Sequence, residues 1–238
     1  MEEEELQNLV RQVGYGERSF AVLRNLVGNR PLASSEQIAD RIAEGIAVGS
    51  ITPGAPLREQ VLAAEFSVSR GPVRAALHLL ERDGLVRLLP NRGAVVTDYS
   101  LREMHQIDQI AVPIVGLYLD LLLERASDET LAEVAEAEKR IERLLDLPDH
   151  VPFVLALAQL TLIMARFSLG QPGEMIFQLL YRPSIRHTIA GLSLPGAVDA
   201  TRANWQLHQK AMQRRDGAAA AHASLELLRH LHNRVLPD

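Results

Sequence analysis

The chain has 238 residues, of which 47% are hydrophobic and 23% are charged, and its formal net charge is −5. This balance is typical of a globular protein, and the net negative charge excludes a protein that coats nucleic acid over its whole surface, although a local basic patch is compatible with it. Because the chain has no cysteine, disulfides, thiolate metal sites and a cysteine nucleophile are excluded.

Residues 1–33 are predicted to form an N-terminal extension that is mainly helical. Two short amphipathic stretches, LQNLVRQV and FAVLRNLV, are separated by GYGE. The acidic start MEEEEL has neither the basic region nor the apolar run of a signal peptide. We therefore expect a cytoplasmic protein.

Residues 34–98 have the pattern of three helices followed by a hairpin. Isoleucines recur every four residues after a serine N-cap, which predicts a first helix from Ser34 or Ser35. A second short helix is expected over REQVLAAEF, and a third over SRGPVRAALHLLERDG, with Ser69 as its N-cap and Gly84 at its end. Two β-prone runs around the turn PNRG then predict a hairpin. Together these elements predict a winged helix-turn-helix.

Residues 99–238 are predicted to be an all-α bundle. Helices are expected near residues 100–125, 128–146, 150–169, 172–191, 196–214 and 217–235, separated by breaks such as LPDHVP and GQPGE. The run VPFVLALAQLTLIMARFSLG carries a single charge, Arg166, and its length alone does not exclude a membrane-spanning helix, which needs about 20 apolar residues. Polar residues inside it and amphipathic neighbouring segments favour a buried bundle helix, so no membrane partner is expected. The predicted fold class is mainly α, with a winged helix-turn-helix before a helical bundle.

The stretch SVSRGPVRAAL at the start of the third helix predicts contact with DNA. In a helix-turn-helix the N-terminal residues of the second motif helix face base edges, and small residues such as Gly71 permit close approach. Arg70 and Arg74 lie one turn apart, and a guanidinium matches guanine O6 and N7. The alternative is that these arginines are solvated charges that pair with Glu81, Asp83 or other acidic residues.

The run PGAPLREQVLAAEFSVSRGPVRAALHLLERDGLVRLLPNRGAVV resembles the DNA-binding domain of GntR-family bacterial transcription regulators, and in particular the FadR-type subfamily. The resemblance covers about residues 34–100 and implies operator contacts from the third helix and the wing. It departs at Ala75, where the family usually has glutamate. With Arg58 at the start of the second helix and Ser67 in the turn, the candidate DNA-binding residues are Arg58, Ser67, Ser69, Arg70, Gly71, Arg74, Asn91, Arg92 and Gly93.

The resemblance extends more weakly to the helical effector domain of the same subfamily, over about residues 101–235. Many such domains hold a divalent metal through Asp-x-x-x-His on one helix and two histidines separated by 21 residues. His208 and His230 have that spacing, but Ala158 and Leu162 occupy the positions of the other two ligands. The two histidines are therefore interior residues, weak metal candidates, or contacts to a metal-free ligand. No cofactor is expected.

The predicted helix that carries Ala158 and Leu162 also contains several leucines, which favours an apolar or amphipathic small-molecule effector. Ala111 and Val115 replace an Arg and a Glu that the family often shows, which argues against an ordinary small carboxylate effector. Candidate effector-binding residues are Arg166, Arg182, Arg186, His208 and His230.

The sequence thus predicts a homodimeric, effector-controlled transcription regulator that binds a palindromic DNA operator. The alternative is a small-molecule or metal-binding helical protein that has lost DNA binding or effector response. No nucleophile elbow, P-loop or dinucleotide fingerprint is present, so no enzyme activity is expected.

Overall fold

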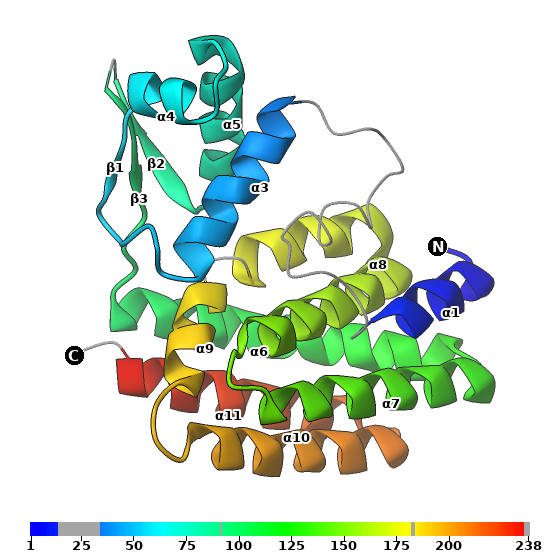
Figure 1. The fold of residues 1–238 in the computed structure, drawn as a ribbon. Coiled ribbons are helices and arrows are strands. Elements are labelled where there is room, and N and C mark those ends of the chain that lie inside the picture. The colour runs from blue at the N-terminus through cyan, green and yellow to red at the C-terminus, as the bar shows by residue number, and fades with distance from the viewer. Residues whose placement is uncertain (14–33, 91, 182–183, 236–238) are drawn as a thin grey trace. The chain divides into compact units, whose positions relative to one another are not determined.

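The computed structural model describes residues 1–13, 34–90, 92–181 and 184–235, which divide into two compact units (Figure 1). One unit combines Met1–Arg18 with Ser100–Asp238, and the other is Ser19–Tyr99. We call them the helical unit and the winged unit. Within the N-terminal extension, helix α1 (Glu3–Gln12) belongs to the helical unit. The second short helix expected in the extension falls outside the described residues.

The winged unit contains α3 (Ser34–Ala47), β1 (Pro56–Leu57), α4 (Glu59–Glu65), α5 (Arg70–Arg82), β2 (Val86–Leu89) and β3 (Gly93–Val96). The four-residue repeat in α3 forms its buried face, and Ile38, Ile42 and Ile46 are each less than 5% exposed. The hairpin of β2 and β3 is confirmed. Strand β1 was not predicted: it pairs antiparallel with β3, which gives the sheet order β1-β3-β2.

Helix α5 has the ends that its sequence predicts. Ser69 is the N-cap residue in extended conformation, and the chain leaves the helix through Gly84 at φ 73°. The amide of Leu85 donates to the Leu80 carbonyl at 3.0 Å and that of Gly84 to Glu81 at 2.9 Å, which is a Schellman motif. Because the helix ends here, β2 starts close to the C-terminus of α5 and the wing folds back beside it.

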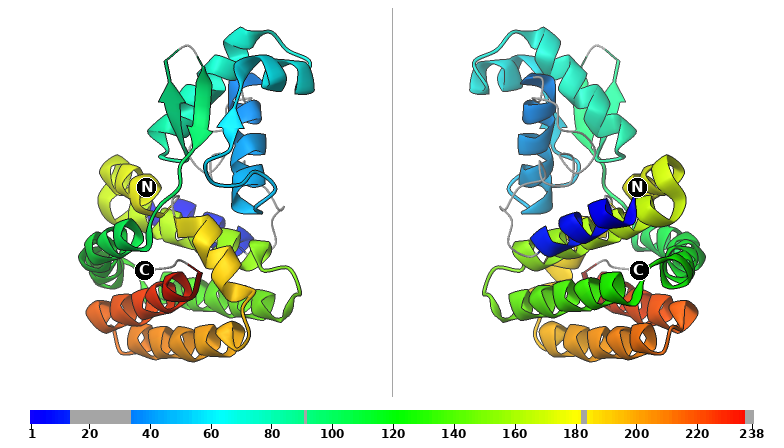
Figure 2. Two further views of the ribbon diagram at one scale, coloured as in Figure 1. Left: turned by 90° about the vertical axis from the view of Figure 1, so that its left-hand side faces the viewer. Right: turned by 90° about the vertical axis from the view of Figure 1, so that its right-hand side faces the viewer.

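The helical unit contains α1, α6 (Leu101–Arg125), α7 (Asp128–Arg143), the short 3-10 helix η1 (Leu144–Asp146), α8 (Val151–Tyr181), α9 (Ile185–Leu192), α10 (Ala197–Gln213) and α11 (Gly217–Val235). Helices α10 and α11 run side by side in both views of Figure 2. The mainly α fold class, with its winged helix-turn-helix and helical bundle, is confirmed.

The backbone of α8 departs from helical geometry at Gly170 (φ 65°), which is at the predicted break GQPGE. The helix predicted over residues 172–191 is described in two parts, the second half of α8 up to Tyr181 and α9 from Ile185, and residues 182–183 between them fall outside the described residues.

Two helices are apolar and long enough to cross a membrane by length and composition alone. The window in Val151–Phe177 is 72% buried inside the fold, which agrees with the predicted bundle helix, whereas the window in α6 is 28% buried. Helix α6 therefore keeps an exposed apolar face.

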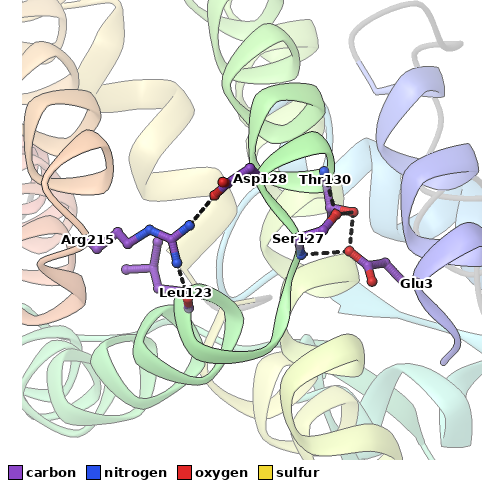
Figure 3. A network of polar contacts seen from close by, with 6 residues as sticks. All are labelled: Glu3, Leu123, Ser127, Asp128, Thr130 and Arg215. Carbon is purple, nitrogen blue, oxygen red and sulfur yellow. Dashed lines mark hydrogen bonds and ion pairs between the residues drawn. The ribbon is translucent and has the colours of Figure 1, made fainter.

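Helix α1 is fixed to the start of α7 by a polar network (Figure 3). The Glu3 carboxylate accepts from the Ser127 amide at 2.7 Å and from the Thr130 hydroxyl at 2.5 Å. These hydrogen bonds lower the pKa of Glu3 from 4.5 to about 2. On the other side of the same turn Arg215 donates to Asp128 and to the Leu123 carbonyl. The N-terminal helix is thus an integral layer of the bundle.

Candidate nucleic-acid interface and ligand cavity

Helices α4 and α5 are joined by a tight turn that fixes the helix-turn-helix geometry. Ser67 adopts φ 54°, a left-handed conformation that is uncommon for a residue other than glycine. The Ser67 amide donates to Ala64 at 3.2 Å and the Val68 amide to Ala63 at 3.0 Å, so both amides of the turn are satisfied. The chain then enters α5 at Ser69, whose side chain makes no capping hydrogen bond.

Helix α5 separates a buried face from an exposed one. Its buried residues are Val73, Ala76, Leu77 and Leu80. Arg70, Gly71 and Arg74 lie on the exposed surface at its N-terminal end, as Ser69 does. The nearest atom to a Cβ built on Gly71 is the Ser69 hydroxyl at 3.9 Å, so the first turn is open for close approach. This arrangement is what base contact from a recognition helix requires.

Arg74 has a partner that the sequence did not reveal. Its Nε and Nη2 atoms donate to the two carboxylate oxygens of Glu59 on α4, at 2.9 and 2.8 Å. Arg74 remains 62% exposed, and its hydrogen bonds lower the pKa of Glu59 below the ordinary value. The carboxylates named from the sequence, Glu81 and Asp83, are not the partners of Arg74, but an exposed ion pair with another acidic residue is what the alternative of solvated, paired arginines allowed. An exposed ion pair is weak, so the guanidinium of Arg74 can leave Glu59 and donate to a guanine base instead at a small cost in free energy.

The wing lies beside the recognition helix. One groove is lined jointly by Glu59 of α4, Arg74 and His78 of α5, and the wing residues Leu88, Leu89, Pro90 and Gly93. Arg92 is exposed at the hairpin turn, and Arg58 is exposed at the start of α4. Asn91 falls outside the described residues. The structure therefore brings residues of α4, of α5 and of the wing together around one groove.

Gly93 has a structural role that its sequence context did not show. It adopts φ 85°, and a Cβ at this position would lie 2.2 Å from the Leu57 carbonyl oxygen. The close approach arises because β1 pairs with β3 directly at Gly93's neighbour Ala94. Any side chain here would force the wing away from β1.

The helical unit encloses a cavity of about 50 Å³ between α6, α7, α8, α10 and α11. Most of its wall is apolar, with Ala111 and Val115 of α6 among the lining residues. The polar residues in the wall are Asp108, Tyr118, Glu138, Thr161, Tyr181, Ser184, Trp205, His208 and Ser224. The leucines predicted to form a pocket do so in part, since Leu157, Leu160 and Met164 line the cavity.

His208 is held on both ring nitrogens. Nε2 lies 3.0 Å from Glu138 Oε1, and Nδ1 lies 3.0 Å from the Ala220 carbonyl and 2.9 Å from Ser224 Oγ. His208 and Glu138 are both buried, with side chains 5% and 3% exposed. Burial lowers the pKa of His208, but the charge of Glu138 and the hydrogen bonds outweigh it, so the pKa lies above 6.5. We interpret the pair as an imidazolium bound to a carboxylate.

A second buried histidine was not among the residues predicted from the sequence. His232, which is 0% exposed, places Nδ1 3.1 Å from Asp108 Oδ2. His230, the residue with the metal-type spacing, is instead exposed and is not brought together with His208. The helical repeat could have found His232, because it lies four residues after the buried Leu228 and therefore on the same face of α11.

These residues do not fit a metal site. Both nitrogens of His208 already face acceptors, whereas a metal needs a free lone pair on a neutral imidazole. Ala158 and Leu162 are buried in α8. Within the described ranges no group of three or more His, Cys, Asp or Glu side chains is placed to hold a metal ion.

Two of the three candidate arginine clamps, Arg166 and Arg186, are among the described residues. Arg166 and Arg186 are partly buried and neither lines the cavity. Arg186 Nη2 lies 2.8 Å from His187 Nε2. Burial raises the pKa of Glu174, and the charge of Arg166 offsets part of that rise. Arg182 falls outside the described residues. The structure therefore places neither Arg166 nor Arg186 in the wall of the cavity.

The winged unit is similar to a family of bacterial regulatory proteins. Residues 34–96 match the model of the bacterial regulatory proteins of the gntR family. The chain is 31% identical to the uncharacterized HTH-type transcriptional regulator YdhC of Bacillus subtilis over 48% of this chain and 52% of the relative. It is 32% identical to a gluconate operon transcriptional repressor of Bacillus licheniformis over 42% of this chain and 41% of that protein. The chain thus spans about half the length of these curated relatives.

The longer similarity is to the HTH-type transcriptional regulator McbR of Escherichia coli, at 24% identity over 81% of this chain and 88% of McbR. The solved structure of E. coli McbR/YncC has the same fold, with a TM-score of 0.65 over 84% of this chain and 95% of that chain at 22% identity. The residues that match the family model are those of the described helix-turn-helix and wing, so this winged helix-turn-helix is similar to the corresponding part of the bacterial regulatory proteins of the gntR family.

Proposed function

We propose that the protein is a sequence-specific DNA-binding transcription regulator of the FadR-type subfamily. The observation that carries the proposal is the exposed N-terminal turn of α5, with Arg70, Gly71 and Arg74 beside the wing, in a domain that matches the GntR family. The relatives named above are regulators or repressors, which supports a cytoplasmic protein of this class without enzyme activity.

The DNA contacts divide by chemistry. Arg70 and Arg74 supply forked donors for base edges, while the Ser67 and Ser69 hydroxyls and Arg58 are suited to phosphates. The wing contributes Arg92, and Asn91 by its place in the hairpin. Gly71 contributes by its small size rather than by a contact.

The regulator acts as a homodimer on a palindromic operator, since a single helix-turn-helix reads only a short half-site. A second copy packs against the apolar patch made by α6 and the second half of α8. The patch exposes Ile110 (54%), Leu117 (47%), Met175 (65%) and Leu179 (66%). The two helices are joined here, because Tyr118 donates to the Gly173 carbonyl at 3.1 Å. Exposed apolar residues on adjacent helices are typical of subunit interfaces.

The cavity of the helical unit is the effector site, with His208 in its wall and without metal. Helix α6 lines the cavity and begins at Leu101, directly after the winged unit ends at Tyr99 and the N-cap Ser100. The Tyr99 hydroxyl donates to the Gly84 carbonyl at 3.1 Å, and Ser100 closes a capping box with Glu103. The chain is therefore held on both sides of the junction. A ligand that binds the protein more tightly in one position of α6 than in another shifts the protein toward that position. The operator affinity then changes by as much as the difference in ligand affinity allows.

The experiment is selection of sheared genomic DNA by the purified full-length chain at physiological salt, followed by sequencing of the bound fragments. We expect enrichment of a short inverted repeat upstream of a few genes. The matched control carries Arg70→Ala and Arg74→Ala, which leave the buried face of α5 unchanged and should abolish the enrichment. Equal fragment recovery by both proteins, or no enriched repeat with and without cell metabolites, would overturn the proposal.

A further inference from the structure

The cavity in the helical unit is unsuited to an anionic ligand. Its wall contains two carboxylates, Asp108 and Glu138, and each is already engaged by a buried histidine at 3.1 and 3.0 Å. No arginine or lysine among the described residues lines it. Among the described residues of the wall, a ligand carboxylate would meet two acidic groups and no cation that is free of a carboxylate partner, which is unfavourable in a buried site.

One residue of the described wall has a buried donor that lacks an acceptor. Trp205 is 2% exposed and lines the cavity, and its indole Nε1 is buried without a hydrogen-bond partner. The ring is held in place by stacking on His208, with centroids 5.3 Å apart, and by edge contact with Phe153 at 6.2 Å. An indole N–H only donates, so its complement is an oxygen or nitrogen acceptor.

The remaining wall sets the size and polarity of the ligand. Side chains such as Leu160, Met164, Leu225 and Leu228 are apolar, and they meet an uncharged molecular body without desolvation cost. The volume of about 50 Å³ exceeds the space of a single water, so it is a cavity for a small group or for one end of a longer molecule.

We propose that the cavity binds a small uncharged molecule with an apolar body and one hydrogen-bond acceptor, which accepts from Trp205 Nε1–H. The inference rests on the effector response proposed above and names the ligand class of that site. It differs from recognition of a carboxylate through a metal ion, for which His208 offers no free nitrogen. The polar pairs in the wall then hold the helices around the ligand and exclude charged competitors.

The test uses the full-length protein in EDTA and four probes of similar size: butanone, butanoate, butylammonium and n-pentane. Trp205 is the only tryptophan in the chain, so its emission reports on the cavity directly. We expect butanone to change the emission and raise the melting temperature, and to bind at least tenfold more tightly than butanoate or butylammonium. Comparable binding of butanoate would overturn the proposal, and so would the absence of any response to all four probes.

The donor is tested with Trp205→Phe, followed by thermal shift and calorimetry. Loss of one hydrogen bond should weaken butanone binding about threefold to tenfold and leave n-pentane binding unchanged. Leu207→Ala, on the same helix but exposed, is the matched control and should leave both unchanged. Equal loss for both probes would refute the role of Nε1–H. If Trp205→Phe does not fold, the comparison of the four probes in the unmodified protein still decides the ligand class.

Failure of this inference is distinguishable from failure of the proposed function. Probe binding is measured without DNA, and operator selection is measured without probes. An enriched operator together with preferred butanoate binding would keep the regulator and reject the ligand class. Stoichiometric Zn²⁺ or Ni²⁺ that quenches Trp205 would reject metal-free recognition.

Discussion

Replacement of Glu138 by glutamine removes the charge that holds His208 while keeping the size of the side chain. Both side chains are nearly inaccessible, at 3% and 5% exposure, and their contact is 3.0 Å. Removing one partner of a buried ion pair typically costs about 3–5 kcal/mol, because the other charge stays buried without compensation. Glutamine still accepts one hydrogen bond from Nε2, so we expect a cost of about 3 kcal/mol while His208 is protonated.

This cost depends on pH with a definite sign. The pKa of His208 is raised above 6.5 in the fold, so its stabilisation is fully present below 6.5 and is lost as pH rises through the folded pKa. Without the Glu138 charge, burial dominates and lowers the pKa of His208, which reverses the dependence. The free-energy difference between the native protein and Glu138→Gln should therefore shrink, to about 1 kcal/mol, once His208 is neutral.

The assay is urea unfolding followed by Trp205 emission, at several pH values between about 5.5 and 9.5. Trp205 stacks on His208, so its signal reports unfolding of the helical unit. Glu136→Gln is the matched control on the same helix. Glu136 is exposed and accepts from Lys139 at 2.7 Å in a surface ion pair, so we expect no measurable change. A Glu138→Gln cost that is constant or grows with pH would refute the charged-pair interpretation.

Three further outcomes are expected. Arg74→Ala should weaken operator binding about tenfold to a hundredfold in titrations and relax discrimination at one base pair. The control Arg82→Ala, at the other end of α5, should change neither. Uniform weakening on all DNA sequences would instead make Arg74 a phosphate contact. Gly93→Ala should lower the melting temperature of the winged unit because the added Cβ would lie 2.2 Å from the Leu57 carbonyl oxygen. Gly71→Ala, whose Cβ would lie 3.9 Å from the Ser69 hydroxyl, should leave the melting temperature unchanged. Equal melting temperatures of the two variants would contradict the close approach at Gly93. Leu117→Glu should convert a dimer to a monomer in light scattering without loss of helix signal, and a dimer that persists would place the interface elsewhere.

The elements of the winged unit were predictable because their signals are local. The isoleucine repeat of α3, the Ser69 cap and Gly84 each act within a few residues, through helical periodicity and backbone conformation. Strand β1 was not predictable in this way, because two residues carry no periodicity and are a strand only where β3 lies beside them. The same pairing gives Gly93 its structural role.

The ion-pair partner of Arg74 could not be read from local sequence signals either. The sequence named Glu81 and Asp83, on or next to α5 itself, among the possible partners, whereas the carboxylate that accepts from the guanidinium is Glu59, 15 residues earlier on α4. The turn at Ser67 brings the two helices together, and the left-handed conformation of that serine has no distinctive signature in the sequence.

The sequence by itself determined the helix-turn-helix with its wing, the helical bundle, the arginine-bearing turn and the apolar character of the pocket. Only the tertiary structure decided which charged groups meet: Glu138 and His208 are 70 residues apart, and Asp108 and His232 are 124 apart. The 21-residue spacing selected His230, yet a shift of two residues along α11 moves a side chain to another face of the helix, which leaves His230 exposed and His232 buried. Periodicity is a property of one helix, whereas a site depends on the rotation of several helices about their axes, and only their packing fixes that rotation.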